Sequence, residues 1–265
     1  MHKYFFVLGF LIISSTGFSQ VERKFYLNFD DQKIDDPPWG SYYGPTGAVM
    51  GNWVTAYEGT HYQFVSPGHG GSGYCFSDIG CNDNDPHIVW YQEGNWIWDE
   101  VYVSYWIRYT CANLLSYPNI KDFYPHWGNN SSSGYVHFAM SGPGDGYYYS
   151  ASDNNGNQIE SAYPSTPGVA NGQWHHMEFW IKFSTAQVRF WYDGSLRLDR
   201  DYNDSVWQYG SSKIYYLTAY KEDASGGSSG TDYFTRQMDD WEVWNGMPNS
   251  DPPPGQVQGI QVTSK

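Results

Sequence analysis

Hydrophobic and polar residues alternate with a period of two in several segments of the chain. This pattern predicts strands, because successive side chains of a strand point to opposite faces. Residues 101–109 carry Val, Val, Tyr, Ile and Tyr at the odd positions and Tyr, Ser, Trp and Arg at the even positions. Both faces are partly apolar, so we expect this strand to lie in the centre of a sheet.

Residues 174–183 show the same alternation and lack the period of 3.6 that a helix needs. Residues 188–192 lead into Asp193-Gly194, a dipeptide that favours the tight turn of a hairpin, and residues 196–198 return from it. Two further strands are expected at residues 214–220 and 238–244. Short strands at a spacing of about ten residues predict an all-β sandwich or barrel.

The first 19 residues are typical of a signal peptide. Lys3 gives a positive start, and residues 4–13 form an apolar run that is too short to span a bilayer. We expect cleavage after Ser19 or Gln20 and export of a soluble bacterial protein to the periplasm or the medium; an uncleaved N-terminal anchor is the alternative. No other stretch is apolar enough for a membrane span.

The C-terminal segment is typical of a linker. Residues 249–255 are polar and rich in proline, so we place the folded domain at residues 20–247 and a linker at 248–265. Residues 256–262 alternate like a strand and resemble the opening of a fibronectin type III repeat. A truncated following domain and a natural tail are the two alternatives.

Three cysteines follow the signal segment. Cys75 and Cys81 bracket a short segment containing Gly and Asp that could form a loop, which predicts a disulfide between them in an oxidising compartment. Cys111 is then a buried thiol, or else the partner of one of the other two. The spacing of the three does not match a zinc site.

Composition narrows the classes of partner. Aromatic residues make up 20% of the 265 residues and charged residues 16%, which excludes a disordered chain. The net charge of −14 repels a phosphate backbone and excludes a basic nucleic-acid site. We expect no nucleic-acid partner and a monomeric protein.

Two segments carry a resemblance to a known superfamily. Residues 172–178 (GQWHHME) followed by residues 188–194 (VRFWYDG) resemble the "G-x-W-H-x-h-E … W-x-D-G" hairpin of concanavalin A-like jelly rolls, where h is an apolar residue. Residues 99–106 and 238–244 resemble the strand before the substrate groove and the closing strand. The resemblance covers roughly residues 24–247. It implies a jelly-roll sandwich of two antiparallel sheets in a secreted, polysaccharide-lyase-like domain, and the superfamily includes hydrolases, lyases and binding modules.

A glycoside hydrolase of this fold would place two carboxylates on one strand face through a Glu-x-Asp-x-x-Glu pattern. That pattern is absent from the sequence. The adjacent acidic pair Asp99-Glu100 would point to opposite faces of a strand. We therefore do not expect a hydrolase of this type.

A polysaccharide lyase needs cationic or amide groups to neutralise a uronate carboxylate and a Tyr or His to remove the C5 proton. Residues 119–127 resemble the groove strand of lyase-like jelly rolls, and residues 134–138 would form the neighbouring strand. The alginate-lyase motifs are not matched in full. The candidate catalytic residues are Lys121, Arg108, His137, Tyr220 and His126.

A binding module without catalysis needs only exposed rings that stack on the apolar faces of sugars. Trp127, Tyr124, Tyr147 and Tyr149 are the candidate substrate-binding residues, with core packing as the alternative for the tyrosines of residues 147–149. Tryptophans in loops add further rings that could stack on sugars, whereas Trp106, Trp174 and Trp241 are expected in the core. An adhesion domain without a sugar site is the remaining alternative.

Calcium is the cofactor that the resemblance suggests, because jelly rolls of this superfamily often clamp their first and last strands with Ca²⁺ held by carboxylate and carbonyl oxygens. Asp30 and Asp240 occupy the matching ends, with solvated acids as the alternative. The sequence thus predicts a secreted jelly roll that binds an extracellular polysaccharide and cleaves it if the lyase residues converge in one groove.

Overall fold

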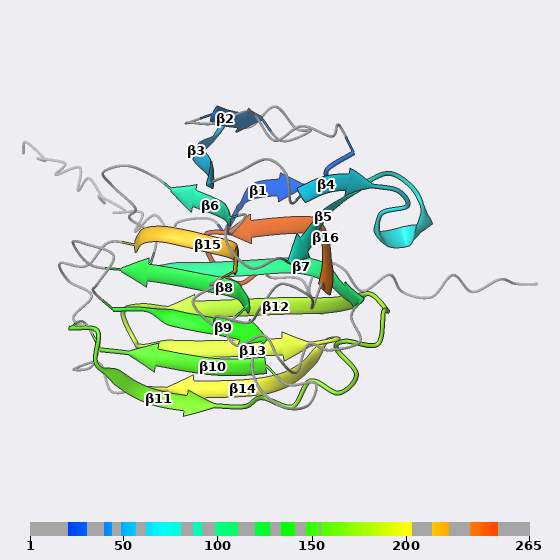
Figure 1. The fold of residues 1–265 in the computed structure, drawn as a ribbon. Coiled ribbons are helices and arrows are strands. Elements are labelled where there is room, and N and C mark those ends of the chain that lie inside the picture. The colour runs from blue at the N-terminus through cyan, green and yellow to red at the C-terminus, as the bar shows by residue number, and fades with distance from the viewer. Residues whose placement is uncertain are drawn as a thin grey trace, which may run out of the picture.

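The alternating segments form two antiparallel sheets in the computed structural model (Figure 1). The structure describes residues 21–30, 40–43, 49–56, 62–80, 87–91, 99–110, 120–127, 134–140, 147–153, 155–202, 214–222 and 234–248. In β2, β3, β6 and β15 it describes the backbone path alone. Within these residues the chain forms sixteen strands and one short 3-10 turn at His69–Gly71, so the fold class is an all-β sandwich, as the alternation predicts.

The first sheet, called sheet A, has β7 near its middle. Its order along the sheet is β14 (Ser195–Asp201), β13 (Gln187–Tyr192), β12 (His175–Lys182), β7 (Glu100–Thr110), β16 (Phe234–Trp244), β5 (Cys75–Gly80) and β4 (Tyr62–Val65), and β1 (Arg23–Leu27) also pairs with β16. Because β7 is paired on both sides, the expectation of a central strand at residues 101–109 is confirmed.

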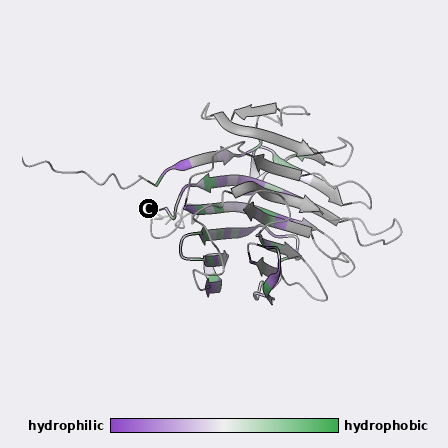
Figure 2. Ribbon diagram, turned by 90° about the vertical axis from the view of Figure 1, so that its left-hand side faces the viewer, coloured by the Kyte–Doolittle hydropathy of each residue, from purple (hydrophilic) through white to green (hydrophobic). Residues whose placement is uncertain are grey.

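The second sheet, called sheet B, lies across from sheet A (Figure 1). Its order is β11 (Gln158–Ala162), β10 (Tyr147–Ser152), β9 (Val136–Met140), β8 (Ile120–Trp127), β15 (Ile214–Glu222), β6 (His87–Tyr91), β3 (Val49–Ala56) and β2 (Gly40–Tyr43). Hydrophobic and hydrophilic residues alternate along the strands, so each sheet turns one face inward and one face outward (Figure 2).

The core lies between the two inward faces. Phe179 of sheet A stacks on Phe123 of sheet B at a ring-centroid distance of 4.7 Å and lies 4.7 Å from Phe138. Phe190 lies 5.0 Å from Phe179, so a continuous aromatic layer joins the sheets. Burial of such rings between the two sheets is the main source of stability for this sandwich.

The β12–β13–β14 segment confirms the predicted hairpin. Asp193 and Gly194 have φ values of 49° and 70°, which is the left-handed region that this two-residue turn requires. Strand β13 pairs with β12 and with β14, and the register shifts at Trp191. The turn dipeptide therefore determines the local fold as the sequence suggests.

The predicted disulfide between Cys75 and Cys81 is wrong. Residues 75–80 form the continuous strand β5 rather than a loop. At about 3.3 Å per residue this strand separates Cys75 from Gly80 by roughly 16 Å, whereas a disulfide needs its two Cα atoms within about 7 Å. Cys75 is a free, buried thiol that donates a hydrogen bond to the carbonyl oxygen of Val65. Cys81 and Cys111 lie outside the described residues.

The predicted signal peptide, residues 1–19, and the C-terminal linker beyond Pro248 also lie outside the described residues. Strand β16 ends at Trp244. Among the residues that the structure describes, no helix has the length and apolar character needed to cross a membrane.

Candidate functional site

The outward face of strands β9, β10 and β11 carries the best candidate site. Val136 and Phe138 of β9, and Tyr147 and Tyr149 of β10, are buried in the core. The residues between them therefore lie on the outward face of sheet B. On this face Ser150 of β10 is paired directly with His137 of β9 and with Ser161 of β11.

A row of rings crosses this face, and we call Tyr135, His137, Tyr148 and Tyr163 the tyrosine cluster. The ring centroids are 5.7 Å apart for Tyr135 and His137, 5.3 Å for His137 and Tyr148, and 5.4 Å for Tyr148 and Tyr163. His137 is only 9% exposed, whereas Tyr163, one residue beyond β11, is 67% exposed. The cluster thus runs from a nearly buried imidazole to an exposed ring at the edge of the sheet.

The chemistry of the tyrosine cluster suits sugars. An exposed ring can stack on the apolar C–H face of a pyranose, and phenol and imidazole groups can bind its hydroxyls. Ile159 of β11, which is 37% exposed, is a further exposed apolar side chain on the same edge strand.

Five of the residues predicted from the sequence lie on β8 and β15 of the same sheet. The position of Lys121 is paired with Ala139 of β9 and with Lys221 of β15. Other pairings link Tyr124 with Thr218, His126 with Tyr216, Trp127 with Ile214, and Tyr220 with Ile88. Only the backbone of these five residues is described, so the structure gives their register positions and not the directions of their side chains.

Arg108 does not share a face with these residues, which corrects its assignment to the same groove. It lies on β7 of sheet A, and its neighbours Ile107 and Tyr109 are buried in the core. Its side chain therefore projects from the outward face of sheet A. The whole thickness of the sandwich separates it from His137.

Tyr147 and Tyr149 cannot contact a substrate, which corrects their assignment as binding residues. Both are 0% exposed and point into the core. Burial raises the pKa of each phenol well above its usual value, so neither is suited to act as a base. Their hydroxyls bond to Asp122 and Tyr202, respectively. The alternative of core packing is the correct one for these two tyrosines, and Tyr148 between them faces outward.

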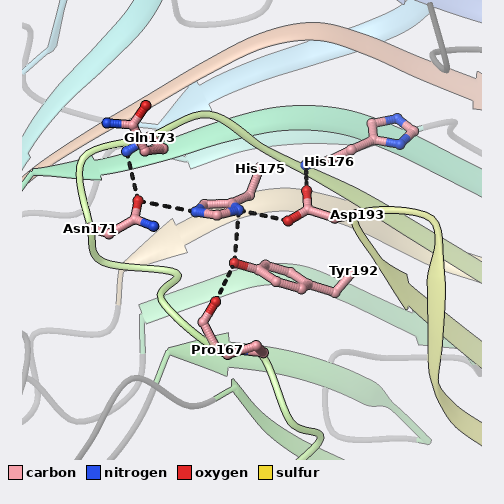
Figure 3. Close-up of polar contacts among 7 residues, drawn as sticks. All are labelled: Pro167, Asn171, Gln173, His175, His176, Tyr192 and Asp193. Carbon is pink, nitrogen blue, oxygen red and sulfur yellow. Dashed lines mark hydrogen bonds and ion pairs between the residues drawn. The ribbon is translucent and has the colours of Figure 1, made fainter. Parts of the chain in front are cut away.

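A second polar network joins the segment before β12 to the β13–β14 turn (Figure 3). His175 Nδ1 lies 2.8 Å from Asp193 Oδ2 and 2.8 Å from the hydroxyl of Tyr192, and its Nε2 lies 3.2 Å from Asn171 Oδ1. Burial would raise the pKa of Asp193, but hydrogen bonds from His175 and from the backbone N–H of His176 outweigh it and lower that pKa. This network ties the segment before β12 to the hairpin and has a structural role.

The carboxylates predicted to bind calcium lie around the 66–74 loop. Asp240 accepts a hydrogen bond from the hydroxyl of Tyr26, and its Oδ2 lies 2.9 Å from Nδ1 of His69. Asp239 accepts hydrogen bonds from the backbone N–H groups of His69 and Asp240. Burial and then the charge of Asp240 raise the pKa of Asp239 to about 7, and the charge of Asp30 adds to this. Asp30 accepts hydrogen bonds from the side chain of Asn28 and from the backbone N–H of Tyr74. Among the described residues no group of three or more His, Cys, Asp or Glu side chains is arranged to hold a metal ion.

No family model and no curated protein matches the sequence. Solved structures match the fold. A structure of botulinum neurotoxin type C, whose cell entry is described as dependent upon interaction with two ganglioside molecules, has a TM-score of 0.50 and 11% identity over 74% of this chain and 43% of its own. The binding domain of botulinum neurotoxin DC in complex with rat synaptotagmin II has a TM-score of 0.50 and 12% identity over 74% of this chain and 44% of its own.

The cellulose-induced protein Cip1 matches over most of both chains. Its TM-score is 0.51 and its identity 16%, over 83% of this chain and 96% of its own. This chain spans less than half of the length of the botulinum chains that it matches. At these identities the likeness shows a shared β-sandwich fold.

Sequence reasoning missed three of the four members of the tyrosine cluster. Tyr148 could have been found, because the run Tyr147-Tyr148-Tyr149 must turn its middle residue to the face opposite its neighbours. Tyr135 has the same parity as His137 and could have been found with it. Tyr163 follows the last residue of β11 and no alternation marks it, so only the tertiary structure could place it beside Tyr148.

Proposed function

We propose that the chain is a carbohydrate-binding β-sandwich that binds a polysaccharide on the outward face of β9–β11. The observation that carries this proposal is the tyrosine cluster, in which Tyr163 is 67% exposed and is packed against Tyr148. Ordered, exposed rings lose little conformational entropy on binding a sugar, because their neighbours already restrict them.

The comparisons support carbohydrate binding by this fold. The structure of botulinum neurotoxin type C is described by its interaction with two ganglioside molecules, which carry sugars, and Cip1 is described as a cellulose-induced protein. The resemblance of the β12–β13 hairpin to concanavalin A-like jelly rolls points the same way. On this basis we propose that the chain belongs to that superfamily and that it acts, as a monomer, outside the bacterial cytoplasm.

Affinity electrophoresis against a panel of neutral and acidic polysaccharides tests the proposal. Tyr163→Ala and Tyr148→Ala should weaken binding about three- to tenfold each, the amount that one aromatic contact contributes. Leu196→Ala is the matched control, since Leu196 is 49% exposed but lies at the β13–β14 hairpin of sheet A. Retention of full affinity in both tyrosine variants would refute this site.

Cleavage by β-elimination is a second candidate function, and the register of sheet B favours it. Lys121 is paired with Ala139, two residues beyond His137 on β9. The cation that neutralises the uronate carboxylate, Lys121, and the base, His137, would then lie on neighbouring strands. In this reaction the base takes the C5 proton of a uronate, the C4–O bond breaks, the departing oxygen takes up a proton, and a C4=C5 double bond forms. Tyr220 and His126 remain alternative acid–base residues on the same sheet.

Absorbance near 235 nm, where the unsaturated product absorbs, separates the two functions. A lyase should release this chromophore from a uronate polysaccharide, and His137→Ala should lower kcat by two orders of magnitude or more. Tyr163→Ala should raise KM and leave kcat nearly unchanged, because it only positions the chain of sugars. Retention of the polysaccharide without any absorbance would identify a binding module.

Calcium binding between the first and last strands also remains a proposal. Asp30 follows β1, and Asp239 and Asp240 lie on β16, so an ion there would be held by carboxylate oxygens and would join the two strands. A calcium-dependent rise in Tm that is lost in Asp30→Asn would support it. An unchanged Tm on removal of calcium with a chelator would contradict it.

A further inference from the structure

The outward face of sheet A, opposite the tyrosine cluster, carries a second set of ordered rings. Trp106 and Trp174 are half-buried on this face, which corrects the expectation that both are core residues, whereas Trp241 is fully buried. The ring of His69 stacks on Trp106 with the centroids 3.8 Å apart and contacts the edge of Trp174 at 5.8 Å.

Arg108 is held rigidly in this set. Its guanidinium carbon lies 4.7 Å from the ring centroid of Trp174, and its Nε donates a hydrogen bond of 2.6 Å to Oε1 of Gln237 on β16. Stacking and this bond fix the plane of the guanidinium while its two terminal nitrogens are not engaged by a carboxylate in the described residues. The group is thus ordered before any ligand arrives.

Two other arginines on sheet A show what is unusual about Arg108. Arg189 stacks on Trp180 and pairs with Asp199 at 3.0 Å. Arg23 stacks near Trp244 and pairs with Glu242 at 2.9 Å. In a chain with 28 acidic and 14 basic residues, each of these stacked arginines has a carboxylate partner, whereas Arg108 is bonded to a neutral amide.

The carboxylates near Arg108 are directed elsewhere. Asp240 is bound by the imidazole of His69 and the hydroxyl of Tyr26. Asp239 accepts the backbone N–H of His69. The positive charge of Arg108 therefore lies on the surface without a compensating carboxylate within ion-pair distance among the described residues.

We propose that Arg108, Gln237 and Trp174 form a second binding site, on the outward face of sheet A, for the carboxylate group of an acidic sugar. A planar guanidinium binds both oxygens of a carboxylate in parallel, and the neighbouring indole and amide offer an apolar wall and a further donor for the sugar. The assignment of a sugar rests on the proposed function, whereas the assignment of a carboxylate rests on Arg108 itself.

The second site would give the protein a preference for acidic sugars, which the tyrosine cluster does not supply. The two sites lie on opposite faces of the sandwich, so one protein molecule could bind two polysaccharide chains, or two segments of one long chain. Selection for acidic sugars would come from sheet A, while the tyrosine cluster would bind neutral and acidic sugars alike.

Calorimetric titration with trigalacturonate and with its methyl ester tests the proposal. The acid should bind at least about tenfold more tightly than the ester, and Arg108→Gln should remove this preference by weakening binding of the acid about 10- to 100-fold. Arg108→Lys keeps the charge but loses the planar fork, so it should restore only part of the affinity. Arg189→Gln is the matched control, a stacked arginine that already has a carboxylate partner, and should change the affinity less than twofold.

The outcomes separate this inference from the proposed function. Equal affinity for acid and ester, equal affinity of wild type and Arg108→Gln for the acid, or no binding of the acid by the wild type would overturn the second site. If Tyr163→Ala weakens binding of acid and ester alike and Arg108→Gln changes nothing, the first site stands and the second fails. If only Arg108→Gln weakens binding of the acid, the second site stands and the first fails.

Discussion

Replacing Arg236 by Met should cost more stability than any surface change, because Arg236 forms the one ion pair among the described residues that is completely buried. Its Nη1 lies 2.9 Å from Oδ1 of Asp122, and both side chains are 0% exposed. The hydroxyls of Tyr109 and Tyr147 donate to the other oxygen of the same carboxylate. Arg236→Met would leave this carboxylate in the core with two neutral donors and no cation.

The expected cost is about 3–5 kcal/mol, the range measured when one partner of a buried pair is removed. For a domain of this size that corresponds to a fall in Tm of roughly 6–20 °C. The double variant Asp122→Asn with Arg236→Met should recover at least half of the loss, because a neutral amide still accepts from the two tyrosines. Arg189→Met, which breaks the exposed pair with Asp199, should cost less than about 1 kcal/mol.

Urea unfolding at pH 7, followed by tryptophan fluorescence, measures these differences. The sign of the pH dependence gives a second check. Burial raises the pKa of Asp122 and Arg236 opposes that rise, so the single variant should raise the pKa of Asp122 further. The loss of stability in Arg236→Met, relative to the wild type, should then become smaller as the pH falls towards 4, because a protonated Asp122 no longer needs a cation. A loss below 1 kcal/mol, or a double variant no more stable than the single one, would refute the reasoning.

Three further predictions follow from other parts of the structure. The hydrogen bond from His175 helps to lower the pKa of Asp193, so the stability that this carboxylate contributes is present above about pH 4 and is lost as the pH falls through its lowered folded-state pKa. Asp193→Asn should therefore make the urea midpoint less dependent on pH between about pH 3 and 5, and an unchanged pH dependence would contradict this. Gly70→Ala, at φ +79° with open space around it, should cost about 1 kcal/mol of stability. Gly73→Ala, at φ +67° and against the carboxylate of Asp30, should cost clearly more, and equal falls in Tm for the two variants would contradict this. Burial raises the pKa of Cys75 to about 12, so iodoacetamide at pH 8 should label Cys75 only after denaturation, as peptide mass spectrometry can show, and rapid labelling of the native protein would be inconsistent with a buried thiol.

The sequence by itself determined the class of fold and part of its topology. A period of two requires strands, and the two partly apolar faces of residues 101–109 required a central position, which β7 has. Asp193-Gly194 specified the β13–β14 turn because few residue pairs tolerate positive φ at both positions. These features are local, so neighbouring residues alone are enough to predict them.

Only the tertiary structure decided which residues share a face and which sheet each strand joins. Alternation separates Tyr147 and Tyr149 from Tyr148 but does not say which face is inward, and it cannot show that Arg108 and His137 lie on opposite sheets. The buried pair joins Asp122 to Arg236, which are 114 residues apart in the sequence. The register shift within β8 between Lys121 and Phe123, and that in β16 between Asp239 and Glu242, move side chains from one face to the other. Such contacts depend on strand pairing over long distances, for which a single sequence carries no local signal.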